Sequence, residues 1–210
     1  MGLSQIDIFL YVVIIISAVV HEYAHGWVAD RLGDPTARLA GRLTLNPLPH
    51  LELFGTVLLP LLLLAFNAPF IGWAKPVPFN PYNLRDSRWG VLKVGLAGPA
   101  ANFALAAVLA AVFRFGPAFA AGFVDPLRLN LFFGFLAWII YINLMLGLFN
   151  LIPVPPLDGS KVIPELLPFR WRVAFGQSFF GIAIALLIAF YFLPTAANAL
   201  FWVFTGESFR

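Results

Sequence analysis

The chain has 210 residues, of which 61% are hydrophobic and only 11% are charged, and its mean hydropathy is +0.89. Soluble domains carry roughly 25% charged residues, so this composition excludes a soluble domain and indicates a polytopic membrane protein with the lipid bilayer as its partner. The net charge of +3 does not indicate nucleic-acid binding, because basic loop residues in membrane proteins fix orientation. The absence of cysteine excludes disulfides and thiolate metal ligands.

Apolar stretches predict four transmembrane helices, at residues 6–29, 91–113, 129–149 and 173–193. Each stretch is long enough to cross a hydrocarbon core of about 30 Å. No Lys or Arg precedes Arg31, so the first stretch lacks the basic start of a signal peptide and is interpreted as a retained span.

Two connecting segments have patterns that do not fit a long helix. Residues 38–45 partly alternate between polar and apolar side chains and predict a short strand. In residues 74–79, Pro76 and Pro78 exclude a helix and favour an extended or edge strand. The last predicted span is expected to end at Pro194.

Residues 51–71 are apolar, but the stretch is short, begins near Glu52 and contains Pro60. A full crossing would place two strongly basic loops on opposite sides of the membrane. A re-entrant path places ten basic residues on one side and two, Arg114 and Arg128, on the other. The positive-inside rule favours the re-entrant path, with the N-terminus outside and the ends of the first and third spans toward the cytoplasm.

His21, Glu22 and His25 form an H-E-x-x-H sequence at the end of the first apolar stretch. Helical residues four positions apart lie on one face, about 6 Å apart along the axis. The two imidazoles can therefore bind one metal ion, and Glu22 can act on a water molecule bound to it. Ionisable groups in a membrane span are costly and usually functional, which favours this interpretation over two core histidines that happen to be four residues apart.

A catalytic zinc site with two histidines needs a third protein ligand and an open position. The sequence does not continue as the longer metzincin motif, so the third ligand must come from elsewhere. The candidates are His50, Asp30, Asp34, Glu52 and Asp158. Asp158 lies in a Pro-Leu-Asp-Gly sequence beside a span end, and Asp-Gly is also a common turn pair.

Three motifs occur in order along the chain: H-E-Y-A-H at 21–25, G-P-A-A-N at 98–102 and N-L-I-P-V-P-P-L-D-G at 150–159. In this combination the chain resembles the site-2 protease family of intramembrane zinc metalloproteases, over residues 20–160. The resemblance implies that His21, His25 and Asp158 bind one Zn²⁺ per chain. It also implies Glu22 as general base, and Asn150 as a group that helps hold the oxyanion or the substrate backbone.

The same resemblance implies a membrane-embedded β structure after the first span, which suits residues 38–45 and 74–79. With the predicted spans and the re-entrant segment, we expect an all-α bundle of transmembrane helices with a small membrane-associated β element. We expect one membrane-embedded metalloprotease domain over residues 1–210, without PDZ or CBS domains. It would cut a peptide bond within or near a transmembrane segment of a membrane-protein substrate. The expected location is the cytoplasmic membrane, with the active site toward the cytoplasm.

Two other functions remain open at this point. The first is a catalytically inactive relative that acts as a binding or chaperone protein, although Glu22 argues against it because a structural zinc site needs no base. The second is an ion or proton transporter, although no internal repeat is visible. Asn102 is predicted to make a polar contact between helices, and His50 is predicted to be an interfacial histidine or a residue that supports the site.

Overall fold

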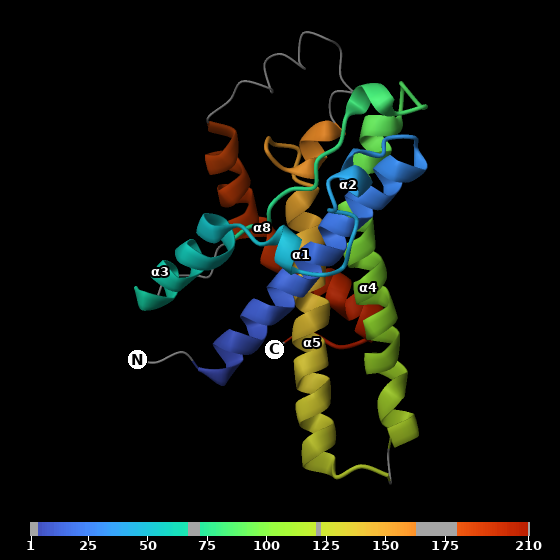
Figure 1. Ribbon diagram of the computed structural model, residues 1–210. Coiled ribbons are helices and arrows are strands. Elements are labelled where there is room, and N and C mark those ends of the chain that lie inside the picture. Colours follow the sequence, from blue (N-terminus) through green and yellow to red (C-terminus); the bar gives the residue numbers. More distant parts are fainter. Residues whose placement is uncertain (1–3, 67–71, 121–122, 163–179, 210) are drawn as a thin grey trace. The chain divides into compact units, whose positions relative to one another are not determined.

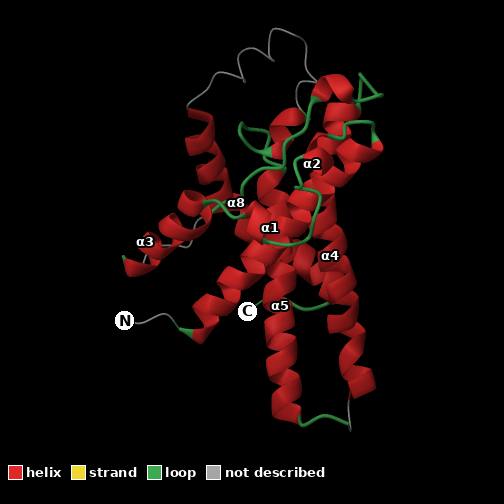
Figure 2. Cartoon of the chain, in the orientation of Figure 1, coloured by secondary structure: helices red, strands yellow, loops and turns green. Residues whose placement is uncertain are grey.

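The computed structural model describes residues 4–66, 72–120, 123–162 and 180–209, and every regular element in these ranges is a helix (Figures 1 and 2). The α-helices are α1 (Gln5–Arg31), α2 (Thr36–Leu39), α3 (Leu59–Ala65), α4 (Gly90–Ala120), α5 (Pro126–Asn150) and α8 (Phe180–Thr205). Single turns of 3₁₀-helix occur at η1 (Leu48–His50), η3 (Pro81–Asn83) and η4 (Asp158–Lys161), and η2 (Leu53–Leu58) is a π-helix. The chain divides into two compact units, Met1–Gly98 and Pro99–Arg210, with the boundary inside α4.

Four helical segments are long and apolar enough to cross a membrane: Gln5–Arg31, Gly90–Ala120, Pro126–Asn150 and Leu187–Thr205. The chain is therefore a multi-pass membrane protein, and the predicted spans at 6–29, 91–113 and 129–149 are confirmed. The first part of the predicted span 173–193 lies outside the described residues. Its predicted end at Pro194 is wrong, because α8 continues through Pro194 to Thr205. Proline is tolerated inside transmembrane helices, where neighbouring groups satisfy the carbonyl that it leaves unpaired.

The segment predicted to be re-entrant contains η2 and α3 in its described part, residues 51–66. The apolar helical stretch Leu53–Leu63 is too short to cross a bilayer, since eleven helical residues rise only about 16 Å. Residues 67–71 lie outside the described part of the chain. The re-entrant path therefore stays a prediction.

In the first unit, α1 begins with a capping box. The Ser4 hydroxyl accepts a hydrogen bond from the Asp7 amide, and the Asp7 carboxylate accepts one from the Ser4 amide at 2.9 Å. The helix ends at Arg31. Two residues later, Gly33 has a φ of +110°, the left-handed conformation that favours glycine, and the Asp34 amide then donates to the Ala29 carbonyl. The chain therefore leaves α1 in a tight turn.

Asp34 organises the loops after α1. Its side chain is fully buried and accepts hydrogen bonds from the hydroxyl and amide of Thr36, from the Asn80 amide at 2.6 Å and from the Asn83 side-chain amide at 2.9 Å. One carboxylate therefore joins the end of α1 to a loop about fifty residues later. Beside it, Ala29, Leu84 and Val94 form a small apolar core.

The predicted strand at 38–45 is wrong. Hydrogen bonds from Thr36 to Asp34 start a helical turn, so Thr36–Leu39 is the short helix α2. Gly41, with φ of +67°, then reverses the chain, and residues 40–45 form turns and bends. The second candidate, 74–79, contains no regular secondary structure, so a β element is not part of the described fold.

The second unit is built on α5, which packs against α8 and the later part of α4. Its core consists of Ala106, Ala110, Leu136, Ile140, Leu144 and Phe201. The small alanines of α4 let the large side chains of α5 approach closely. Within this apolar core the Asn102 side-chain amide donates to the Asn143 side-chain oxygen at 2.9 Å, and both residues are fully buried. This confirms the predicted role of Asn102 as a polar contact between helices.

Replacement of Asp34 by asparagine is expected to lower the free energy of unfolding by about 1–3 kcal/mol, because an uncharged amide cannot accept from all four donors. Burial by itself raises the pKa of Asp34, but the hydrogen bonds from Thr36, Asn83 and Asn80 outweigh it and hold the pKa below its usual value of 3.8. The folded-state pKa is therefore depressed. The stabilisation is present above pH 3.8 and is lost as the pH falls through the folded-state value.

Thermal unfolding of the detergent-solubilised protein checks this prediction. The difference in melting temperature between wild type and Asp34→Asn should be constant near neutral pH and should shrink below the ordinary carboxyl pKa of 3.8. A difference that is the same at pH 7 and at strongly acidic pH would contradict the role assigned to the ionised carboxylate.

Candidate metal centre

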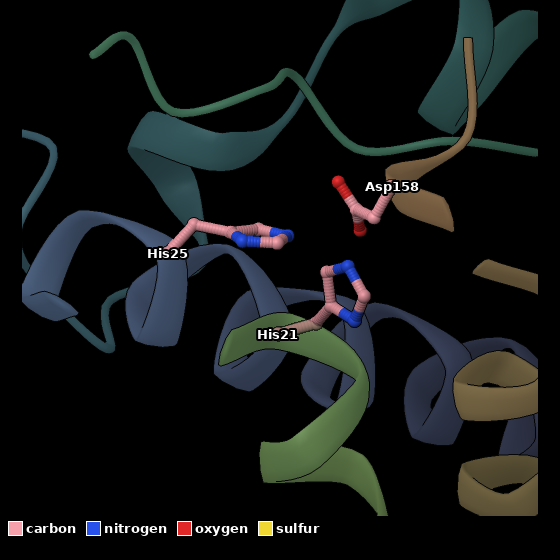
Figure 3. Close-up of side chains that lie close together, drawn as sticks. All are labelled: His21, His25 and Asp158. Carbon is pink, nitrogen blue, oxygen red and sulfur yellow. The ribbon is translucent and has the colours of Figure 1, made fainter. Parts of the chain in front are cut away.

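The two motif histidines lie on one side of α1, as their spacing predicts. His21 and His25 are each 6% exposed, and their ring centroids are 4.6 Å apart at an interplanar angle of 81°. Figure 3 shows the two imidazoles rising from successive turns of the helix with their rings directed toward one another. Two neutral imidazoles this close are the nitrogen donors that Zn²⁺ prefers.

A backbone carbonyl fixes the orientation of the second histidine. His25 Nδ1 lies 2.6 Å from the Val94 carbonyl oxygen, which can only accept a hydrogen bond. Nδ1 must therefore carry the proton, and Nε2 of the neutral ring is left with a lone pair available to a metal ion. A histidine that ligates a metal commonly has its other nitrogen held in this way.

Gly98 lies directly against the Nε2 atoms of both histidines. A Cβ atom at this position would be 2.5 Å from His21 Nε2 and closer still to His25 Nε2. The two Nε2 atoms therefore converge on one place beside α4, and only a residue without a side chain leaves room for them. This cradle and the nitrogen donors fit a zinc ion, and they explain why the first residue of the G-P-A-A-N motif is glycine.

Glu22 lies beside the histidines and is held by the backbone of a distant loop. The Val77 amide donates a hydrogen bond of 2.7 Å to Glu22 Oε2. This hydrogen bond does not involve the other carboxylate oxygen, Glu22 Oε1. The carboxylate is thus anchored at one oxygen and carries a second oxygen for chemistry.

In the second unit Asp158 opens the 3₁₀ turn η4 and is 7% exposed. Its Oδ1 pairs with Lys161 Nζ at 2.7 Å. A Cβ at the next residue, Gly159, would collide with the Leu151 carbonyl oxygen and lie 2.6 Å from that of Ile152. Glycine therefore lets η4 approach the backbone just after α5, which sets the position of Asp158. Figure 3 labels this residue with the two histidines as the predicted ligand set.

Asn150 is the last residue of α5 and is partly buried. Its side-chain nitrogen donates to the Leu146 carbonyl at 3.0 Å, one helical turn earlier. The amide nitrogen carries two hydrogens, so one N–H and the side-chain oxygen are not used by this bond. This leaves a donor of the kind that stabilises an oxyanion.

The other candidate ligands have different roles in the described structure. Both carboxylate oxygens of Asp34 accept hydrogen bonds in the loop junction, and Asp30 pairs with Arg38 at 3.2 Å. His50 is 1% exposed, and its Nε2 lies 2.9 Å from the Thr44 carbonyl oxygen, which makes Nε2 the donor. The ring is thus buried within the protein, and its location at the membrane interface stays a prediction. The Glu52 amide donates to the Thr56 hydroxyl at 3.0 Å.

Several groups that hold the site have no signal in the sequence. The Val94 carbonyl and the Val77 amide belong to backbone, so their side chains do not reveal them. Lys161 follows Asp158 by three residues, a spacing that could have indicated a pair across one turn. Gly98 was visible as part of a motif, but its contact with the histidines depends on how α1 and α4 meet.

Gly98→Ala is expected to weaken zinc binding by about 10–100-fold, because the added Cβ overlaps both ligating nitrogens. Zinc content and competition with a chelator, measured on purified protein, check this. Thermal unfolding of the variant, measured in parallel, separates a loss of zinc binding from a loss of folding. Gly134→Ala is the matched control, because a Cβ there meets nothing within 4 Å. Wild-type zinc affinity in Gly98→Ala would show that zinc does not bind in the space where the two histidine nitrogens meet Gly98.

A family model described as Peptidase family M50 matches residues 9–127 and 121–194. The chain is 40% identical over 174 residues to "Putative zinc metalloprotease YwhC" of Bacillus subtilis, covering 81% of this chain and 74% of that protein. It is 29% identical over 217 residues to "Putative zinc metalloprotease Rip2" of Mycobacterium tuberculosis strain H37Rv, covering 99% of this chain and 79% of that protein. "Zinc metalloprotease MJ0392" of Methanocaldococcus jannaschii is 27% identical over 162 residues, covering 77% of this chain and 35% of that protein.

No solved structure matches the chain. The family model nevertheless covers most of the sequence, and the relatives align over most of its length. The chain therefore belongs to the site-2 protease family of intramembrane zinc metalloproteases, Peptidase family M50.

Proposed function

We propose that this zinc metalloprotease hydrolyses a peptide bond within or near a transmembrane segment of another membrane protein, and that His21, His25 and Asp158 are its zinc ligands. The observation that carries the proposal is the convergence of His21 Nε2 and His25 Nε2 against Gly98. A catalytic zinc has three protein ligands and one open position, and a buried carboxylate is a suitable third ligand. Asp158 supplies such a carboxylate and lies at the end of the motif shared with the family.

Zinc, when bound, polarises the scissile carbonyl and makes water nucleophilic at neutral pH. Glu22 takes the proton of the attacking water, whose oxygen adds to the carbonyl carbon. The C–N bond then breaks, and Glu22 returns the proton to the leaving amine nitrogen. The products are a new carboxylic acid and a new amine, and transfer of the acid proton to the amine gives a carboxylate and an ammonium group. Glu22 ends in its original ionisation state.

The remaining amide hydrogen of Asn150 is proposed to donate to the oxygen of the scissile carbonyl as negative charge develops on it. Removal of one such donor from an acyl-transfer site typically costs about 100–1,000-fold in kcat. The bond from Asn150 to Leu146 restrains the side chain at the end of α5 and so limits its rotation. The same donor could hold the substrate backbone.

A transmembrane substrate must unwind before it is cut. In an intact helix the scissile carbonyl accepts a hydrogen bond from the amide four residues later, and neighbouring turns cover it. Helix-weakening residues such as glycine and proline near the cleavage point should therefore matter more than a strict side-chain code. A single-span membrane protein with such a weak point is the proposed class of substrate.

Replacement of Glu22 by glutamine should lower cleavage by about 100–10,000-fold while zinc remains bound, because the amide cannot accept the proton. Replacement of Asp158 by asparagine, or of His21 by alanine, should lower zinc content below about one ion per chain as well. The test co-expresses each variant with single-span reporters that contain a Gly-Pro pair in the membrane, and measures metal content after purification. Reporter cleavage that is unchanged in Glu22→Gln would contradict the proposal and favour a non-catalytic binding role.

We further propose that the protein lies in the cytoplasmic membrane with residues 51–71 re-entrant and the active site toward the cytoplasm. The loop charges support this orientation: ten basic residues then share one side with the ends of the first and third spans. The short apolar helix Leu53–Leu63 suits a segment that enters the bilayer and returns.

The cysteine-free chain allows a direct test of this topology by single cysteine substitutions. Arg31→Cys and Lys75→Cys should both react with a membrane-impermeant thiol reagent only from the cytoplasmic side. Arg128→Cys is the control for the other side and should react from outside. If residues 31 and 75 react from opposite sides, segment 51–71 crosses the membrane and the re-entrant model is wrong.

A further inference from the structure

Backbone hydrogen bonds along one edge of the segment from Trp73 to Val77 join it to other parts of the first unit. The Trp73 amide donates to the Gly55 carbonyl at 3.2 Å, and the Trp73 carbonyl accepts from the Thr56 hydroxyl at 2.8 Å. The Lys75 amide donates to the His50 carbonyl at 2.9 Å, and the Lys75 carbonyl accepts from Arg42 at 2.7 Å. Residues 73 and 75 thus use both backbone groups toward the protein.

The third amide of this edge is that of Val77, and its partner is the Glu22 carboxylate at 2.7 Å. Backbone groups alternate in direction along an extended chain, so residues 73, 75 and 77 share one edge. The intervening positions are Ala74, Pro76 and Pro78, and proline has no amide to donate. The amides of residues 73, 75 and 77 therefore all point to one edge, and the last of them donates to Glu22.

The Val77 side chain fixes the register of this amide. Val77 is 7% exposed, and a Cβ at Gly26 would lie 3.0 Å from Val77 Cγ1 and 3.2 Å from the Ala37 side chain. The valine therefore packs closely over the turn of α1 that follows His25. Downstream, the Asn80 amide is held by Asp34 at 2.6 Å, so the segment is fixed on both sides of Val77.

We propose that Val77 is a positioning residue, whose backbone N–H orients the Glu22 carboxylate for proton transfer. This inference rests on the proposed role of Glu22 as base. A glutamate side chain has three rotatable bonds, and a charge-assisted hydrogen bond to one oxygen selects the rotamer that turns the other oxygen toward the reacting water. The anchor comes from a segment that is itself held by Gly55, Thr56, His50 and Arg42.

The inference predicts a loss in kcat rather than in substrate binding. A carboxylate that samples other rotamers is misplaced by about 1 Å or more, and such a misplacement can cost 100-fold in rate. The histidines keep their own supports, the Val94 carbonyl and Gly98, so zinc binding should not change. If the hydrogen bond from Val77 to Glu22 were inhibitory, its removal would raise kcat, because the base would then be free to react.

The experiment replaces the Val77 amide by an ester, through incorporation of the α-hydroxy analogue of valine during cell-free synthesis into liposomes. This change removes the N–H and keeps the side chain. Val77→Pro removes the same group by ordinary mutagenesis. The same ester replacement at Ala74, whose amide lies on the opposite edge of the extended segment, is the matched control. A single-span reporter cleaved by the wild type supplies kcat and KM, and metal analysis supplies the zinc content.

We expect kcat to fall about 10–100-fold in the Val77 ester and proline variants, with KM and zinc content close to wild type and with near wild-type kcat in the Ala74 control. If Val77→Pro does not fold, the ester variant decides. A kcat for the ester variant within twofold of wild type, or above it, would overturn the inference. Glu22→Gln in the same assay separates the two proposals: if it still cleaves, the proposed function fails, whereas if only the ester is without effect, the positioning role fails.

Discussion

The structure depends on the cost of placing ionisable side chains in an apolar helix. His21, Glu22 and His25 lie near the end of a 27-residue helix and follow a long, mainly apolar stretch of it. A charged or polar group without partners in such surroundings is strongly destabilising. Glu22 and His25 are therefore held by other segments of the first unit, which provide their hydrogen-bond partners.

The partners are mainly backbone groups. His25 donates to the Val94 carbonyl, Glu22 accepts from the Val77 amide, and Gly98 leaves the space where the two histidine nitrogens converge. A backbone group adds little side-chain entropy cost and no charge of its own, and it is fixed once its segment is folded. This explains why a proline-containing loop and a glycine-containing helix, rather than further polar side chains, lie beside the motif.

The sequence was sufficient for the features that follow from local spacing. The face shared by His21 and His25, three of the four spans and the contact of Asn102 with Asn143 agree with expectation. The prediction of a strand at 38–45 was wrong because Asp34, which precedes that segment, accepts hydrogen bonds from Thr36, and these bonds start a helix.

Other features could not be predicted because they depend on distant contacts. Pro194 does not end α8, since an apolar helix within a membrane tolerates a proline that would end a helix in water. His50 is buried by loops that meet only in the folded unit. The Val77 amide and the Val94 carbonyl carry no information in their side chains, so their contacts with Glu22 and His25 appear only in three dimensions.

Asp158 shows that a turn and a ligand are compatible interpretations of the same two residues. Gly159 is required because η4 passes close to the Leu151 carbonyl, and that is a structural reason for Asp-Gly at this point. The same close approach buries the carboxylate beside the end of α5, where an unpaired negative charge would be costly. Lys161 compensates that charge from within the turn, through one of the two oxygens. The geometry that makes the turn therefore also holds the buried carboxylate of Asp158 in place for its proposed role as a zinc ligand.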